Sequence, residues 1–157
     1  MKFRKGTTLV ELLIAVALIA VIGFFAFLNL FTARGQNDLQ NTTRSIAALL
    51  REARSRSVSQ TSSSAWGVHL ENSTTSAPFY ALFFSQNYGP TSTLGYYRLP
   101  PSVGYVTSSI AAGSSREITF SQLSGLASAS TSVTIYLINT PGSSSTVTVA
   151  SSGAVSY

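Results

Sequence analysis

The chain has 157 residues, of which 45% are hydrophobic and 10% are charged, and it contains no cysteine. Without cysteine it can form neither a disulfide nor a thiolate metal site, so its folded part is held by packing alone. The formal net charge of +5 is typical of proteins that bind nucleic acid or anionic membranes. However, three of the ten basic residues are Lys2, Arg4 and Lys5, and without them seven basic side chains face five acidic ones. The basicity is therefore concentrated at the N-terminal end.

A long apolar segment follows this basic end. From Leu12 to Leu28 no side chain carries a charge, an amide or a hydroxyl. A helix of this length covers roughly 25 Å at about 1.5 Å per residue, and Leu9, Val10, Leu30 and Phe31 extend it enough to cross a bilayer. The basic residues before it predict a cytoplasmic N-terminus and an extracytoplasmic remainder.

Glu11 lies at the start of the apolar segment rather than outside it. An ionisable group at membrane depth costs on the order of 3 kcal/mol on the insertion scale, so a partner is expected for it. The alternative is an interfacial carboxylate that extends into the lipid headgroups.

A short motif surrounds Gly6: the basic residues Lys2, Arg4 and Lys5 are followed by this glycine, a polar pair, an apolar pair and Glu11. The motif resembles the type III signal of bacterial type IV prepilins and pseudopilins. The resemblance implies that a prepilin peptidase cuts after the glycine. Residues 1–6 would then be a leader, and residues 7–31 a helix that serves first as a membrane anchor and later as the filament core.

The resemblance also implies roles for the residues after the cut. Thr7 would become the new N-terminus and the site of N-methylation, where the family usually has Phe. In pilins the matching glutamate is thought to meet the N-terminal amine of a neighbouring subunit, so Glu11 would set the axial register of the filament. The residues expected to pack in the filament core are Leu12, Leu13, Val16, Leu18, Ile19, Val21 and Gly23.

Two other targeting segments compete with this interpretation. A secretory signal has an apolar core of about 7 to 15 residues before a small-residue cleavage site. Here the apolar segment is longer, it is headed by Glu11, and the nearest candidate site, at Thr32-Ala33, is poor. An uncut signal anchor that holds an extracytoplasmic domain is the other alternative.

The helical pattern continues over residues 32–58. Thr32 to Asn41 is mostly polar, and Gly35 is a weak point where a helix could bend at a cost of about 1 kcal/mol relative to Ala. From Thr43 the apolar residues recur at helical spacing and predict an amphipathic helix that lies against a sheet. These residues are Ile46, Leu49, Leu50 and Ala53.

Arg44, Arg51, Arg54 and Arg56 take other faces of this helix. They could form a basic strip for nucleic acid. The alternative, which we favour, is a solvated helix face whose arginines interact with the C-terminal helix dipole and with Glu52.

From Ala65 the hydrophobic period changes to two, which predicts strands over residues 59–157. Gly, Pro and Ser residues between these strands predict an antiparallel sheet with exposed loops. We expect His69 on the solvent face of the first strand. The predicted strands are 66–70, 79–84, 95–99, 103–106, 117–120, 132–138, 146–149 and 154–157.

The C-terminal half resembles the H-type minor pseudopilins and their type IV pilus counterparts more closely than other branches. In these a helix that ends in an Ala-Arg pair leads into the first strand, as Ala53-Arg54 precedes Trp66-Gly67-Val68, and a glycine precedes the last strand, as in Gly153-Ala154-Val155. The resemblance implies an α+β, type IV pilin-like fold: one long N-terminal helix packed on a C-terminal antiparallel β-sheet head. Some pilus members bind DNA through basic residues next to this glycine. Residues 153–157 contain no arginine, so no nucleic-acid partner is expected.

Few residues of the chain could support catalysis. His69 is the single histidine, and beyond Glu11 the carboxylates are scattered, so no acid/base pair or calcium loop is evident. No Gly-x-Ser-x-Gly elbow and no Gly-rich phosphate motif occur. We therefore expect no enzyme, no cofactor and no metal. The scattered carboxylates are Asp38, Glu52, Glu71 and Glu117.

The resemblance predicts a minor pilin or pseudopilin, a structural subunit of a type IV pilus or a type II secretion pseudopilus. Its partners would be the prepilin peptidase, other pilin or pseudopilin subunits and the assembly platform of the inner membrane. The chain would be a single-pass inner-membrane protein with an extracytoplasmic head, and later part of a filament. Two alternatives remain: a major pilin, and a DNA-uptake or adhesive minor pilin. The residues available to the second alternative are Arg44, Arg51, Arg54, Tyr88, Tyr96 and Tyr97.

Overall fold

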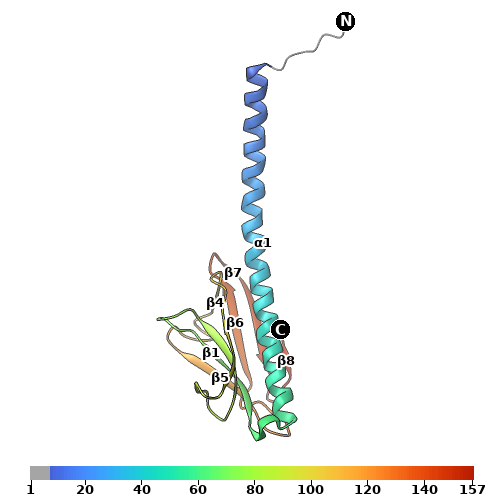
Figure 1. Cartoon of the computed structure of the whole chain (residues 1–157), viewed down its shortest axis with the longest axis vertical. Helices are drawn as coiled ribbons and strands as arrows, with labels where there is room; N and C mark the ends of the chain where they lie inside the picture. The colour runs from blue at the N-terminus through green and yellow to red at the C-terminus, as the bar shows by residue number, and fades with distance from the viewer. Residues whose placement is uncertain (1–7) are drawn as a thin grey trace. The chain divides into compact units, whose positions relative to one another are not determined.

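A computed structural model describes the backbone of residues 8–157, and the side chains of these residues except for 25–33. It contains the helix α1 (Leu9–Val58), the short 3-10 helix η1 (Thr61–Ser63) and eight strands (Figure 1). The chain divides into two compact units, Met1–Arg34 and Gly35–Tyr157, and α1 contributes residues to both. The fold class of the described chain is α+β, as predicted.

The strands of the second unit form two sheets, and every strand pair is antiparallel. The first sheet has the order β3-β2-β1-β5: β3 (Thr93–Arg98), β2 (Phe79–Phe84), β1 (Trp66–Glu71) and β5 (Ser115–Phe120). The second has the order β4-β6-β7-β8: β4 (Val103–Tyr105), β6 (Thr131–Leu137), β7 (Thr140–Val149) and β8 (Val155–Ser156). The prediction of a single sheet was wrong, because the spacing of strands along the chain does not reveal which strands pair.

All eight predicted strands are present, most of them with ends shifted by one or two residues. The largest difference is at β7, which begins at Thr140 rather than at Thr146. Its first residues are polar and exposed, so they carry no hydrophobic alternation. They are nevertheless in the ladder, because Thr140 pairs with Leu137 across the β6–β7 hairpin.

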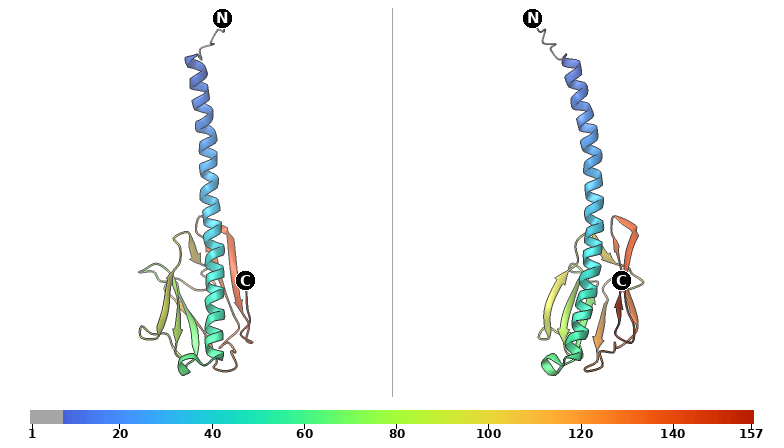
Figure 2. Two further views of the ribbon diagram at one scale, coloured as in Figure 1. Left: turned by 45° about the vertical axis from the view of Figure 1, so that its right-hand side comes forward. Right: turned by 90° about the vertical axis from the view of Figure 1, so that its right-hand side faces the viewer.

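A single hydrophobic core holds the second unit together, and residues 35–58 of α1 lie along both sheets (Figure 2). The predicted helical stripe is confirmed, because Ile46, Leu50 and Ala53 have no exposed surface. They pack in one cluster with side chains from both sheets, including the fully buried Trp66 and Ile135. Full burial of side chains of this size contributes about 1.5 to 3 kcal/mol each, so the helix joins the two sheets into one body.

Candidate assembly surface

Thr8 begins helix α1. Its hydroxyl accepts a hydrogen bond from the backbone N–H of Glu11 at 3.3 Å, and its carbonyl accepts one from the N–H of Leu12 at 3.2 Å. Thr8 is therefore the N-cap, and Glu11 is the third helical residue, the position that a capping box fills with Glu or Gln. The Thr-x-x-Glu spacing of Thr8 and Glu11 is the signal for this cap in the sequence.

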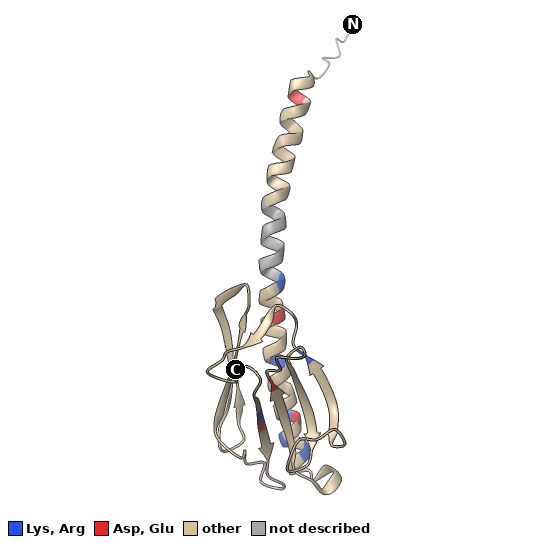
Figure 3. Cartoon of the chain, turned by 90° about the vertical axis from the view of Figure 1, so that its left-hand side faces the viewer, with Lys and Arg blue, Asp and Glu red and all other residues tan. Residues whose placement is uncertain are grey.

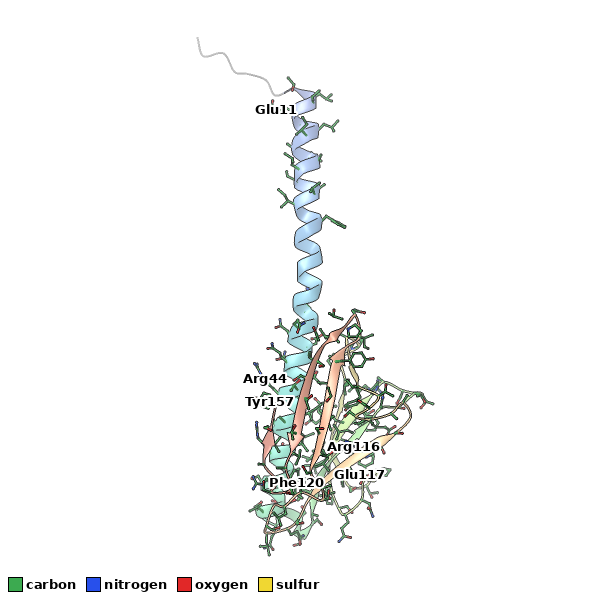
Figure 4. All side chains as sticks on the ribbon, turned by 180° about the vertical axis from the view of Figure 1, so that it is seen from behind. Glu11, Arg44, Arg116, Glu117, Phe120 and Tyr157 are labelled. Atoms are coloured by element: carbon green, nitrogen blue, oxygen red, sulfur yellow. The ribbon has the colours of Figure 1, made fainter. Side chains whose placement is uncertain are left out.

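The carboxylate of Glu11 is the one charge between Leu9 and Phe24 (Figures 3 and 4). Glu11 is exposed, and its carboxylate has no hydrogen-bond or ion-pair partner among the described residues. A negative charge in the first turn of a helix is favoured by the helix dipole. The predicted cleavage and methylation residues, Gly6 and Thr7, lie outside the described residues.

Apart from Glu11, the helix from Leu9 to Phe24 is apolar around its whole circumference. Its large side chains are between 54% and 80% exposed, and they include all the predicted core-packing residues that have large side chains. At Gly23 an added Cβ would meet nothing within 4 Å. In the part of the chain that is described, no helix combines the length and the apolarity needed to cross a membrane.

The arginines of α1 are mostly engaged within the head. Arg56 pairs with Glu52 at 2.7 Å, which confirms the expected interaction with that carboxylate, and its guanidinium also lies over the ring of Trp66. Arg51 donates to the carbonyl of Val155 at 3.0 Å. They do not form the continuous free basic strip that the nucleic-acid interpretation requires.

Two further arginines of α1 differ in their surroundings. Arg54 donates through Nη2 to the carbonyl of Ser152 at 3.3 Å, while its buried Nε has no hydrogen-bond partner. Arg44 is exposed and has no partner among the described residues. Within residues 35–58 of α1, Arg44 is the one arginine without a partner, and a single free arginine offers little electrostatic attraction to a polyanion.

The prediction for His69 was wrong: this side chain is buried, with 4% of the residue exposed. Its Nδ1 lies 3.3 Å from a carboxylate oxygen of Glu117, and its Nε2 lies 3.2 Å from one of Glu71. Two carboxylates that look scattered in the sequence therefore meet at one histidine. Glu71 shares a strand face with His69, whereas Glu117 is its cross-strand neighbour on β5, a pairing that hydrophobic periodicity cannot predict.

Both nitrogens of the His69 ring face acceptor oxygens. Which ring nitrogen donates depends on the tautomer. The two carboxylates lie at different ring nitrogens and cannot share one metal ion with the histidine. No group of three His, Asp or Glu side chains in the described chain could hold a metal.

Aromatic side chains cover the face of the first sheet that carries His69. Tyr88, from the loop between β2 and β3, stacks on the imidazole with ring centroids 3.8 Å apart, and Tyr96 lies over Phe79 at 4.5 Å. Tyr97 instead stacks on Tyr80 at 5.4 Å. These are the three tyrosines available to a DNA-uptake or adhesive pilin. Tyr88 is partly buried, while Tyr96 and Tyr97 are nearly half exposed.

These features define an α+β protein with a two-sheet head and an exposed apolar helical segment. Comparison of the chain with protein-family models, with curated protein sequences and with solved structures gives no match.

Proposed function

We propose that this chain is a minor pilin or pseudopilin, a structural subunit that assembles into a type IV pilus or a type II secretion pseudopilus. Residues 9–24 would pack against the same segment of other subunits, and the head would lie outside the inner membrane. This proposal concerns assembly and involves no catalytic step. It refines the α+β class to a type IV pilin-like fold.

The observation that carries the proposal is the pairing of an all-round apolar helical surface with one charged side chain. A helix that is apolar on every face belongs in a membrane or in the core of a helix bundle. Burial of each exposed leucine, isoleucine or valine would contribute about 1.5 to 3 kcal/mol, so this surface strongly favours apolar surroundings. Small residues such as Gly23 allow neighbouring helices to approach closely.

Glu11 gives such a bundle its register. A carboxylate moved into apolar surroundings is destabilising unless it is paired, and none of the described residues pairs with it. A cut after Gly6 by the prepilin peptidase would create a positive amine at Thr7. In a filament, the amine of a neighbouring subunit is the partner that we assign to Glu11.

The first test is the mass of the N-terminal peptide of the protein purified from membranes and from sheared surface filaments of its host. We expect a chain that starts at Thr7, with or without one methyl group. A chain that retains Lys2 to Gly6, or one that starts near Ala33, would contradict the proposal.

The second test separates the charge of Glu11 from its place in the capping box. Glu11→Gln keeps a side chain that suits the third helical position but removes the charge, whereas Thr8→Ala removes the N-cap and keeps the charge. We expect Glu11→Gln, Glu11→Ala and Glu11→Val to insert normally into the membrane but to be at least about ten-fold depleted from filaments. Thr8→Ala should assemble. Normal incorporation of Glu11→Gln would mean that the residue acts only as a helix cap and would refute the register role.

A further inference from the structure

A cleft of about 650 Å³ opens at one end of the first sheet. At this end Trp66, the first residue of β1, pairs with Phe84 and Phe120, the last residues of β2 and β5. Three short segments meet there and line the cleft: 63–65, 85–86 and 119–122. Its volume lies in the range of about 300 to 1,000 Å³ that is usual for ligand sites.

Backbone hydrogen bonds hold the walls of the cleft in place. The N–H of Ser85 donates to the carbonyl of Ala65 at 2.9 Å, and the N–H of Ser121 donates to the carbonyl of Leu126 at 2.8 Å. Phe120, which is labelled in Figure 4, is fully buried at the end of β5. It contributes to the lining of the cleft. Since the walls are fixed by the fold, a ligand would bind without first ordering them.

Most of the side chains that line the cleft are polar, and none is charged. Seven of the nine lining residues carry a hydroxyl or an amide, and in the described structure none of these seven side-chain groups makes an intramolecular hydrogen bond. Hydroxyl and amide groups both donate and accept, so the cleft offers mixed hydrogen-bonding capacity without a net charge. The seven residues are Ser63, Ser64, Ser85, Gln86, Thr119, Ser121 and Gln122.

The backbone at the rim is strained. Among the described residues, four non-glycine residues have positive φ: Gln60 at 52°, Ser62 at 60°, Ser63 at 48° and Leu123 at 64°. Gln60 and Ser62 lie just before the lining segment 63–65, and Ser63 is part of it. Leu123 directly follows the lining segment 119–122. Each costs roughly 1 to 2 kcal/mol, and such strain concentrates at functional sites.

We propose that this cleft binds an uncharged, polyhydroxylated ligand, an oligosaccharide. The hydroxyls of a sugar act as donor and acceptor in turn, which matches the serine and glutamine side chains, and a neutral ligand matches a lining without charges. A peptide would call for apolar pockets for its side chains, and a polyanion would call for arginine or lysine. The lining contains no arginine or lysine, and its two apolar residues are the fully buried Phe120 and the half-buried Ala65.

The proposal is tested with the full-length chain in detergent micelles on a printed array of neutral and sialylated oligosaccharides. The double variant Gln86→Ala, Gln122→Ala removes two exposed amides, and Gln40→Ala removes one from the exposed surface of α1 as a matched control. Loss of two hydrogen bonds should weaken binding by at least about ten-fold. The control should bind like the wild type, and the melting temperatures of all three proteins should agree.

We expect a set of neutral oligosaccharides to bind and the double variant to lose them. Binding to sialylated oligosaccharides alone would overturn the assignment of a neutral ligand. Equal binding by the double variant would place the site elsewhere, and the absence of binding to any oligosaccharide on the array would overturn the proposal. None of these outcomes depends on filament assembly, because the cleft belongs to the second unit and does not involve Glu11.

Discussion

Gly153 lies just before β8, and its substitution by alanine provides a sharp test of the packing of the head. Its φ is +79°, in the left-handed region that glycine adopts without cost. A Cβ built there would overlap the backbone carbonyl of Gly125 and lie 2.8 Å from Nε of Arg54. Gly125 is itself held at a positive φ beside Val58, so the carbonyl has little room to move.

The destabilisation expected for Gly153→Ala has two parts. The left-handed backbone costs a residue with a Cβ about 1 to 2 kcal/mol relative to glycine. Overpacking against a fixed backbone atom typically costs a further 1 to 3 kcal/mol. We therefore expect a loss of about 3 kcal/mol, which for a domain of this size corresponds to a fall in melting temperature of roughly 10 °C.

The assay is thermal unfolding of the full chain in detergent, followed by near-ultraviolet circular dichroism, in which the buried Trp66 reports on the core. Gly142→Ala is the matched control, since a Cβ there meets nothing within 4 Å and its φ is not positive. We expect Gly142→Ala to unfold within about 0.5 kcal/mol of the wild type. If Gly153→Ala were equally neutral, the close approach of the Gly153 and Gly125 backbones would be refuted.

Two further substitutions test the buried polar groups of the head. Burial raises the pKa of Tyr105 above its ordinary value of 10.0, so the unfolded chain releases this proton first and stability falls as pH rises above about 10. Tyr105→Phe should therefore remove part of the loss of stability at alkaline pH, measured as the unfolding free energy against pH. At neutral pH it should cost about 1 kcal/mol, because the hydrogen bond to the carbonyl of Phe79 is lost. An unchanged dependence of the unfolding free energy on alkaline pH would contradict the first expectation. His69→Leu should cost about 1 to 2 kcal/mol and accelerate amide exchange in residues 85–92, because both carboxylate contacts and the stack on Tyr88 are lost. Tyr88→Phe keeps the stack and should leave that exchange slow, so equal acceleration in both variants would show that stacking does not hold the loop.

The sequence alone determined the elements of this protein. Strict alternation around Val68, and apolar residues at helical spacing around Ile46, predict a strand and a helix from local patterns, and the structure contains both. The apolar segment that begins at Glu11 is also evident from the sequence alone, because hydrophobicity and charge are properties of the side chains themselves. These local signals carry the proposal for assembly.

Only the tertiary structure decided which elements meet. The division of the strands into two sheets depends on pairings between distant segments, and no local pattern encodes these. Likewise, His69 is polar and was expected at the surface, yet it is buried because Glu117 from β5 and Tyr88 from a loop satisfy and cover it. The cleft beyond Trp66 is formed by three segments that are separated in the sequence, 63–65, 85–86 and 119–122, and only the fold brings them together. A periodic pattern shows that an element has an apolar face, but what covers each of its faces is decided by the long-range packing of the whole chain.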